Sequence, residues 1–208
     1  MKLRDRLAAA SFTAGPAAFL GGWILMLPID GDLVPGPWWT AAHAVWLVGF
    51  LFFGVMTLAL RRMAGPVTGG RRVAVEAVAG VALLSVAANV VQLAIDLAAG
   101  LASADGAALR AAIEGAKANP IVETAVYTIG AQLFFVALLV FAVLLAVLRR
   151  VTPVSAAVAV SGVVVLAGAT LGIGRDSALV AVGMALLWLG VLLLGRGPQT
   201  GQAAPGFG

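Results

Sequence analysis

Six long apolar segments follow one another along the chain and constrain its fold more than any other feature. They cover residues 11–29, 40–60, 73–99, 120–148, 153–173 and 177–195. Each is long enough to cross a hydrocarbon core of about 30 Å as an α-helix, which pairs its backbone polar groups internally. The sequence therefore predicts an all-α polytopic membrane protein. We expect one domain over residues 1–195, a bundle of six transmembrane helices, and a disordered cytoplasmic tail at 196–208.

Composition supports this class, because apolar residues make up 62% of the 208 and charged residues only 11%, which excludes an ordinary soluble domain. The chain contains no cysteine, so disulfides, thiolate nucleophiles and cysteine-ligated metals are excluded. The strong excess of Arg over Lys, with abundant Ala, Gly and Val, is typical of a bacterial protein.

Residues that favour helix ends mark the limits of the segments. We expect helix starts at Thr40, at Asn119 with Pro120, at Thr152 with Pro153, and at Asp176 or Ser177. Pro16 and Pro28 should kink or end the first segment. Trp38 and Trp39 precede the second segment, where indole rings favour the membrane interface.

The longest loop and one glycine pair allow two further predictions. In residues 100–119, Asp105 predicts the cap of a short amphipathic helix that carries Leu109 and Ile113 on one face. Such a helix would cover the outer end of the bundle. Gly168 and Gly172 form a small-xxx-small pair, which predicts a close helix contact in the fifth segment.

Lys and Arg are divided unequally between the two ends of the predicted spans. Ten of the 13 lie on the side of both chain termini: Lys2, Arg4, Arg6, Arg61, Arg62, Arg71, Arg72, Arg149, Arg150 and Arg196. Cytoplasmic loops carry this excess, so both termini are predicted to be cytoplasmic, in a bacterial inner membrane. The basic residues are thus topology signals and indicate no nucleic-acid partner. Glu76 is expected to pair with Arg71 and Arg72.

The third segment carries a polar stripe, formed by Ser85, Asn89, Gln92 and Asp96. Their spacing of four, three and four residues places them on one face of an α-helix. Because a polar face toward lipid is costly, we expect the stripe to face other helices or a pocket.

The predicted topology brings polar residues of three segments to the same depth in the outer half of the membrane. These residues are His43, Gln92, Asp96, Glu123 and Tyr127, with Thr124, Thr128 and Gln132 on a neighbouring ridge. We predict Asp96, Glu123, His43 and Tyr127 as acid–base groups, and Asn89, Gln92, Gln132 and Thr128 as ligand contacts, with Asn89 as the pocket floor.

Structural roles also account for several of these residues. Glu123 in the first turn of a helix is favoured by the helix dipole alone. Asp96 lies near a helix C-terminus, where the dipole is unfavourable, and a hydrogen bond to Tyr127 would satisfy it. His43 is the only histidine, and the spacing of the carboxylates around it is a poor metal signature, so we predict no metal and no cofactor.

The second segment reads HAVWLVGFLFFGVMTLALRR and is followed by a Gly/Arg loop and an Ala/Gly-rich third segment. In this general pattern the chain resembles small multi-helix integral membrane proteins of actinobacteria, a group without an established activity. The resemblance implies the architecture and carries no functional residue over to this chain.

These observations predict an outward-facing intramembrane pocket that binds a hydrophobic small molecule or a lipid. An enzymatic form of this hypothesis is acid–base chemistry on a lipid or an isoprenoid-like substrate. Two alternatives stay open: a transporter or transporter component, and a structural subunit of a membrane complex. The predicted partners are the lipid bilayer and the ligand, with a homo-oligomer or larger complex as a further option.

Overall fold

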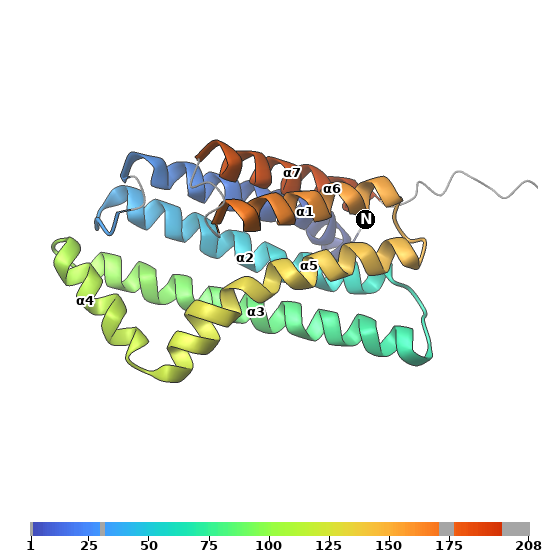
Figure 1. Cartoon of the computed structure of the whole chain (residues 1–208), viewed down its shortest axis with the longest axis horizontal. Coiled ribbons are helices and arrows are strands. Elements are labelled where there is room, and N and C mark those ends of the chain that lie inside the picture. The colour runs from blue at the N-terminus through green and yellow to red at the C-terminus, as the bar shows by residue number, and fades with distance from the viewer. Residues whose placement is uncertain (1, 30–31, 171–176, 197–208) are drawn as a thin grey trace, which may run out of the picture.

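The computed structural model describes residues 2–29, 32–170 and 177–196, and the regular structure within these ranges is helical. Figure 1 shows helices that run lengthwise through an elongated molecule. In chain order they are α1 (Leu3–Met26), the 3₁₀ turn η1 (Leu27–Ile29), α2 (Pro37–Met63), α3 (Gly69–Ala102), α4 (Gly106–Lys117), the π-helix η2 (Val122–Thr128), α5 (Ile129–Val147), α6 (Pro153–Thr170) and α7 (Ser177–Arg196).

Five of these elements, α1 with η1, α2, α3, α6 and α7, are long and apolar enough to cross a membrane. The pair of η2 and α5 provides a sixth span when the two are counted together, although they are bent by 48° relative to each other. The expectation of an all-α fold is therefore confirmed for the described residues, and five or six of the helices have the length and composition of a multi-pass membrane bundle.

The six spans form a closed ring. Each packs against the next in the order α1, α2, α3, α5, α6, α7, and α7 packs against α1. Short connections make sequential antiparallel helices neighbours, which explains this order. The short α4 contacts α3 and η2 at one end of the ring, and Figure 1 shows it lying obliquely there. Its Leu109 and Ile113 are buried, as the sequence predicts.

Aromatic side chains fill the centre of the ring. The rings of Phe50, Phe53 and Phe134 contact one another with centroids 4.6–5.8 Å apart. Phe53 and Phe134 are almost fully buried, and from there the core continues through Met56 and Phe141 toward the arginine-rich end. One half of the bundle is therefore tightly packed with apolar side chains.

Three predicted helix starts are confirmed by side-chain caps. The Asn119 carboxamide oxygen accepts a hydrogen bond from the backbone N–H of Ile121 at 2.9 Å. The Thr152 hydroxyl accepts one from the N–H of Ser155 at 3.1 Å. The Asp105 carboxylate accepts one from Ala108 at the start of α4, at 2.8 Å. Each oxygen satisfies an N–H group that the first turn leaves unpaired.

Other expectations about helix ends are met only in part. The expected start at Ser177 is confirmed, since α7 begins there. Thr40 lies inside α2, whose N-cap is Gly36. The helix begins earlier than expected because Pro37 suits the first turn, where the backbone N–H has no partner within the helix. α1 continues through Pro16, and only Pro28 lies where that helix ends. Trp38 is half-exposed as an interface residue would be, whereas Trp39 is buried with its indole against Gly100.

Two predicted contacts are replaced by others. Glu76 forms a two-bond ion pair with Arg61 of α2, with both N···O distances at 2.8 Å, because the antiparallel packing brings that side chain opposite. A Cβ added at Gly168 would have no heavy atom of a described residue within 4 Å, so Gly168 makes no close helix contact within the described part of the chain. Gly162 and Gly190 make the close contacts of α6 with α7 instead. Gly172 lies outside the described residues.

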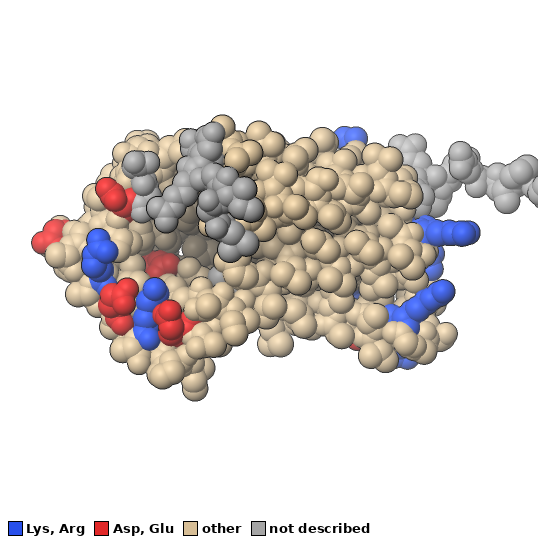
Figure 2. Space-filling model, viewed as in Figure 1, with Lys and Arg blue, Asp and Glu red and all other residues tan. Residues whose placement is uncertain are grey.

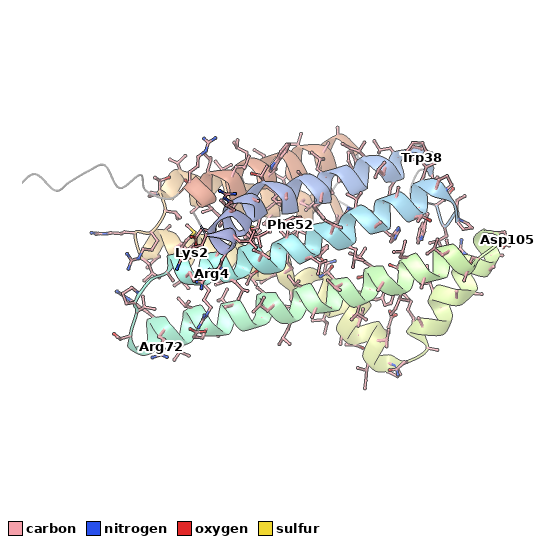
Figure 3. The ribbon with its side chains drawn as sticks, turned by 180° about the vertical axis from the view of Figure 1, so that it is seen from behind. Lys2, Arg4, Trp38, Phe52, Arg72 and Asp105 are labelled. Carbon is pink, nitrogen blue, oxygen red and sulfur yellow. The ribbon has the colours of Figure 1, made fainter. Side chains whose placement is uncertain are left out.

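Charge separates the two ends of the molecule. In Figure 2 Lys and Arg dominate one end, and most of the visible Asp and Glu lie at the other. Figure 3 places Lys2, Arg4 and Arg72 at the basic end and Trp38 and Asp105 at the opposite end. α1 begins and α7 ends at the basic end, as an even number of spans requires (Figure 1). Of the predicted tail, Arg196 belongs to α7 and the rest lies outside the described residues.

Candidate functional site

Asp96 and Tyr127 form a direct contact between α3 and η2. The Tyr127 hydroxyl donates a hydrogen bond of 2.7 Å to a carboxyl oxygen of Asp96. Asp96 is buried, and the indole N–H of Trp39 donates to its backbone carbonyl oxygen at 3.0 Å. Three elements, α2, α3 and η2, therefore meet at Asp96. The hydrogen bond to Tyr127 is the structural role named above as one option for this residue.

His43 lies behind this contact, next to Trp39. Its imidazole stacks on the Trp39 indole with centroids 4.0 Å apart, and its Nδ1 lies 2.8 Å from the Trp39 carbonyl oxygen. A carbonyl oxygen only accepts hydrogen bonds, so Nδ1 carries the hydrogen and Nε2 is the acceptor nitrogen of the neutral ring. His43 thus reaches Asp96 through Trp39, and no direct hydrogen bond joins the two side chains in the described structure.

Lys117 and Glu123 form a charged pair beside Tyr127. The Lys117 ammonium lies 3.9 Å from a Glu123 carboxylate oxygen and 5.2 Å from the centroid of the Tyr127 ring. A second, longer-range partner is Glu114, at 4.0 Å. The paired oxygen of Glu123, Oε2, is buried and accepts no hydrogen bond from any described residue. The Glu123 side chain as a whole is 43% exposed, so its carboxylate is reachable from the surface.

Ser85 and Asn89, the first half of the polar stripe, form hydrogen bonds at the bend between η2 and α5. Where the π-helix changes to α-helix, the Gly130 carbonyl oxygen accepts a hydrogen bond from the Ser85 hydroxyl and another from the Asn89 Nδ2 at 3.4 Å. Asn89 also donates to the Ser85 carbonyl at 2.8 Å. In a membrane, polar side chains of a neighbouring helix can supply the hydrogen bonds that an irregular backbone lacks. Ser85 and Asn89 are buried and do this here, so the expectation that the stripe faces protein is confirmed at these two residues.

A chamber lies inside the ring, in the half that contains this bend. Its volume is about 410 Å³, and all six spans contribute to its walls. Most of the lining is apolar and aromatic, including Phe19, Trp23, Trp46, Phe50 and Phe135. The Phe53–Phe134 contact closes it toward the basic end. A chamber of this size and lining suits an apolar or lipid-like ligand.

A groove of about 710 Å³ runs along the outside of η2, α5 and α6. Four of its six polar residues, Lys117, Glu123, Tyr127 and Thr128, lie at the end near α4, where Figure 2 shows the surface hollowed, and the other two are Gln132 and Thr170. The rest of the groove follows the apolar length of the span. This wall is formed by Phe135, Val136, Leu139, Val163, Val164 and Ala167.

The groove and the chamber adjoin each other between α5 and α6. Gln132, Phe135, Val163, Ala167 and Thr170 line both spaces. The Gln132 side chain makes no hydrogen bond with any described residue, so its carboxamide is available at this junction. A molecule that occupies the groove therefore lies one layer of side chains away from the chamber.

The predicted site residues divide between these features. Glu123, Tyr127, Thr128 and Gln132 line the groove, and Asn89 lines the chamber. Asp96, His43 and Gln92 line neither, and the Gln92 carboxamide oxygen is buried without a partner among the described residues. The acid–base and ligand roles of all eight stay predictions.

Sequence reasoning missed two residues of the site, Trp39 and Lys117. Trp39 was assigned to the membrane interface because of its position, although its buried indole joins His43 to Asp96. Lys117 has no role in the site predicted from the sequence. Its position could have indicated its contact with Glu123, because Lys117 lies two residues before Asn119. Asn119 caps the helix that carries Glu123 and Tyr127.

Within the described residues, no three His, Asp or Glu side chains are grouped so that they could hold a metal ion. Comparison of the chain with protein-family models, curated proteins and solved structures found no match. The function is therefore argued from the geometry alone.

Proposed function

We propose that this chain is a multi-pass protein of a bacterial inner membrane that binds an amphipathic, lipid-like molecule through the groove between α5 and α6. In this proposal both termini are cytoplasmic. The concentration of arginines at the end where α1 begins and α7 ends supports that orientation. The groove then opens sideways to the outer leaflet.

One observation carries the proposal: the order of polar and apolar residues along the groove matches the order of parts in an amphipathic molecule. Polar side chains gather near α4, and a wall of Phe, Val, Leu and Ala follows toward the middle of the span. A ligand already dissolved in the bilayer reaches such a groove without leaving the membrane. Its apolar part then finds further aromatic surface in the adjoining chamber.

The charged end of the groove favours a headgroup that donates a hydrogen bond. The half-exposed Glu123 carboxylate accepts hydrogen bonds, and the Lys117 ammonium lies close enough to attract a headgroup oxygen. A hydroxyl group satisfies both requirements. Tyr127 is the member of the Asp96–Tyr127 pair that reaches the groove, so acid–base chemistry on the ligand would pass through its hydroxyl.

A photoreactive long-chain alcohol tests this proposal. The probe carries a diazirine within its chain and a terminal alkyne, and it is irradiated with the purified protein in neutral detergent. We expect saturable labelling of peptides from α5 and α6, because Val136, Leu139 and Val164 line the apolar part of the groove. Labelling spread evenly over all six spans would contradict the proposal.

A matched pair of variants makes the test specific. Ala167→Trp fills the junction of groove and chamber and should lower labelling about ten-fold, as the loss of one apolar subsite predicts. Ala157→Trp places the same side chain on the same helix at an exposed position that lines neither space, and should leave labelling unchanged. If Ala167→Trp does not fold, Val164→Trp fills the exposed groove instead. Equal labelling of the groove variant and Ala157→Trp would overturn the proposal.

A further inference from the structure

A third cavity lies at the basic end of the molecule, opposite the groove. It has a volume of about 510 Å³ and is formed where the α2–α3 loop meets the end of α5. Arg71, Arg149 and Arg150 line it, together with apolar residues that include Val67, Val147 and Leu148. None of the described residues in its lining is acidic.

The charge of this cavity is not balanced within the described structure. The side chains of Arg71 and Arg149 form no ion pair and no hydrogen bond with described residues, and the Arg150 guanidinium donates only to the Ala64 carbonyl oxygen among them, at 3.2 Å. The neighbouring cavity is different, because there Glu76 pairs with Arg61. Two adjacent cavities therefore contain arginines, but only one contains the carboxylate that neutralises part of their charge.

Local structure makes the imbalance more pronounced. Arg71 lies in the first turn of α3, where the helix dipole disfavours cations. This first turn contains no acidic residue. Arg149 adopts a φ of 56°, a conformation that residues other than glycine seldom adopt. An anion in the cavity between these two arginines would offset the unfavourable placement of the Arg71 charge.

We propose that this cavity binds the phosphate of an anionic phospholipid from the leaflet at the basic end. Arginine guanidinium groups bind phosphate oxygens with two parallel hydrogen bonds, and basic pockets between transmembrane helices bind lipid headgroups. The same cavity is lined by Leu148 and by Val147, whose side chain is 67% exposed. An acyl chain can therefore continue from the headgroup along α5, which favours a lipid over free phosphate.

Lipid titration of the delipidated protein in neutral detergent tests this proposal. Phosphatidylglycerol is added in one series, phosphatidylcholine in a second and inorganic phosphate in a third, and binding is followed by the midpoint of thermal unfolding. We expect saturable stabilisation by phosphatidylglycerol at about ten-fold lower concentration than by phosphatidylcholine. Stabilisation by inorganic phosphate at the same concentrations would assign the cavity to a free anion and overturn the lipid proposal.

Two double variants with equal net charge separate a site from a diffuse basic surface. Arg71→Gln with Arg149→Gln removes the unpaired arginines of the cavity and should weaken phosphatidylglycerol binding about ten-fold. Arg62→Gln with Arg72→Gln removes two arginines of the neighbouring cavity, keeps the Arg61–Glu76 pair, and should leave binding within about two-fold. An equal loss in both double variants would refute a specific site.

The Arg150 guanidinium is left intact in both variants because it holds the Ala64 carbonyl and therefore supports the loop itself. If the first double variant does not fold, the single change Arg149→Lys keeps the charge and loses the planar fork of donors. We expect that variant to bind phosphatidylglycerol several-fold more weakly while its unfolding midpoint without lipid stays near that of the wild type. Unchanged binding would contradict the proposal. The cavity is remote from the groove, so this result is independent of the proposed function.

Discussion

The α6–α7 pair and the α3–α5 pair hold their helices together in different ways. α6 and α7 approach through glycines: a Cβ at Gly162 would overlap the backbone of Leu187, and one at Gly190 would overlap Ala159. α3 and α5 instead share hydrogen bonds from Ser85 and Asn89 to the Gly130 carbonyl oxygen. One contact depends on shape alone and the other on polar groups.

The difference explains where empty space is found in the bundle. Backbone-to-backbone contact between α6 and α7 leaves no room between the two helices. The α3–α5 contact stabilises a bent helix, and a bent helix cannot pack evenly along both of its neighbours. The groove lies along the other side of the same bend, against α6. Polar residues in the third span thus support a shape that contains cavities.

The largest effect on stability is expected from Gly162→Ala. The added methyl group meets the backbone of Leu187, which cannot rotate away as a side chain can, so α6 and α7 must separate. We expect the free energy of unfolding to fall by about 3 kcal/mol, the upper part of the range for overpacked sites. Unfolding in mixed micelles with increasing sodium dodecyl sulfate measures the change. A loss near zero would show that the α6–α7 contact is loose and would remove the contrast with α3–α5.

Much of the fold was predictable because it depends on local rules. Span positions follow from hydropathy, and the starts at Asn119 and Thr152 follow from the chemistry of N-caps. The helix of the long loop was predictable for the same reason, since Asp105 caps it and Leu109 is buried.

Features that depend on neighbours in space were not predictable in the same way. A glycine shows the absence of a side chain but not which backbone lies opposite, so Gly168 was chosen where Gly162 makes the contact. The chamber needs walls from all six spans and has no sequence signal of its own. The candidate site lies between these cases: the Asp96–Tyr127 pair followed from depth and spacing, whereas Trp39 required the structure.

A smaller effect on stability is expected at the Asp96–Tyr127 contact. This contact is a second polar interaction of α3, made with η2 instead of α5. Tyr127→Phe removes the donor and leaves the Asp96 carboxyl buried without it, so the free energy of unfolding should fall by about 1.5 kcal/mol. Asp96→Asn keeps an acceptor oxygen for the tyrosine and should cost about 0.5 kcal/mol. The same unfolding titration measures both variants. A larger cost for Asp96→Asn than for Tyr127→Phe would show that the charge of Asp96, rather than this hydrogen bond, holds the contact.

The smallest effect, with the opposite sign, is expected from Gly168→Ala. This position lies on α6, six residues after Gly162, and an added Cβ has no heavy atom of any described residue within 4 Å. Alanine restricts the unfolded chain more than glycine and suits the helix better, so we expect a gain of about 0.5 kcal/mol in the free energy of unfolding. Measured beside Gly162→Ala, the variant makes the same chemical change on the same helix and differs only in what lies opposite. A large loss at Gly168 would mean that α6 has a second close partner at this position, and the exposed face of α6 near the groove would then be a contact surface with another copy or another protein.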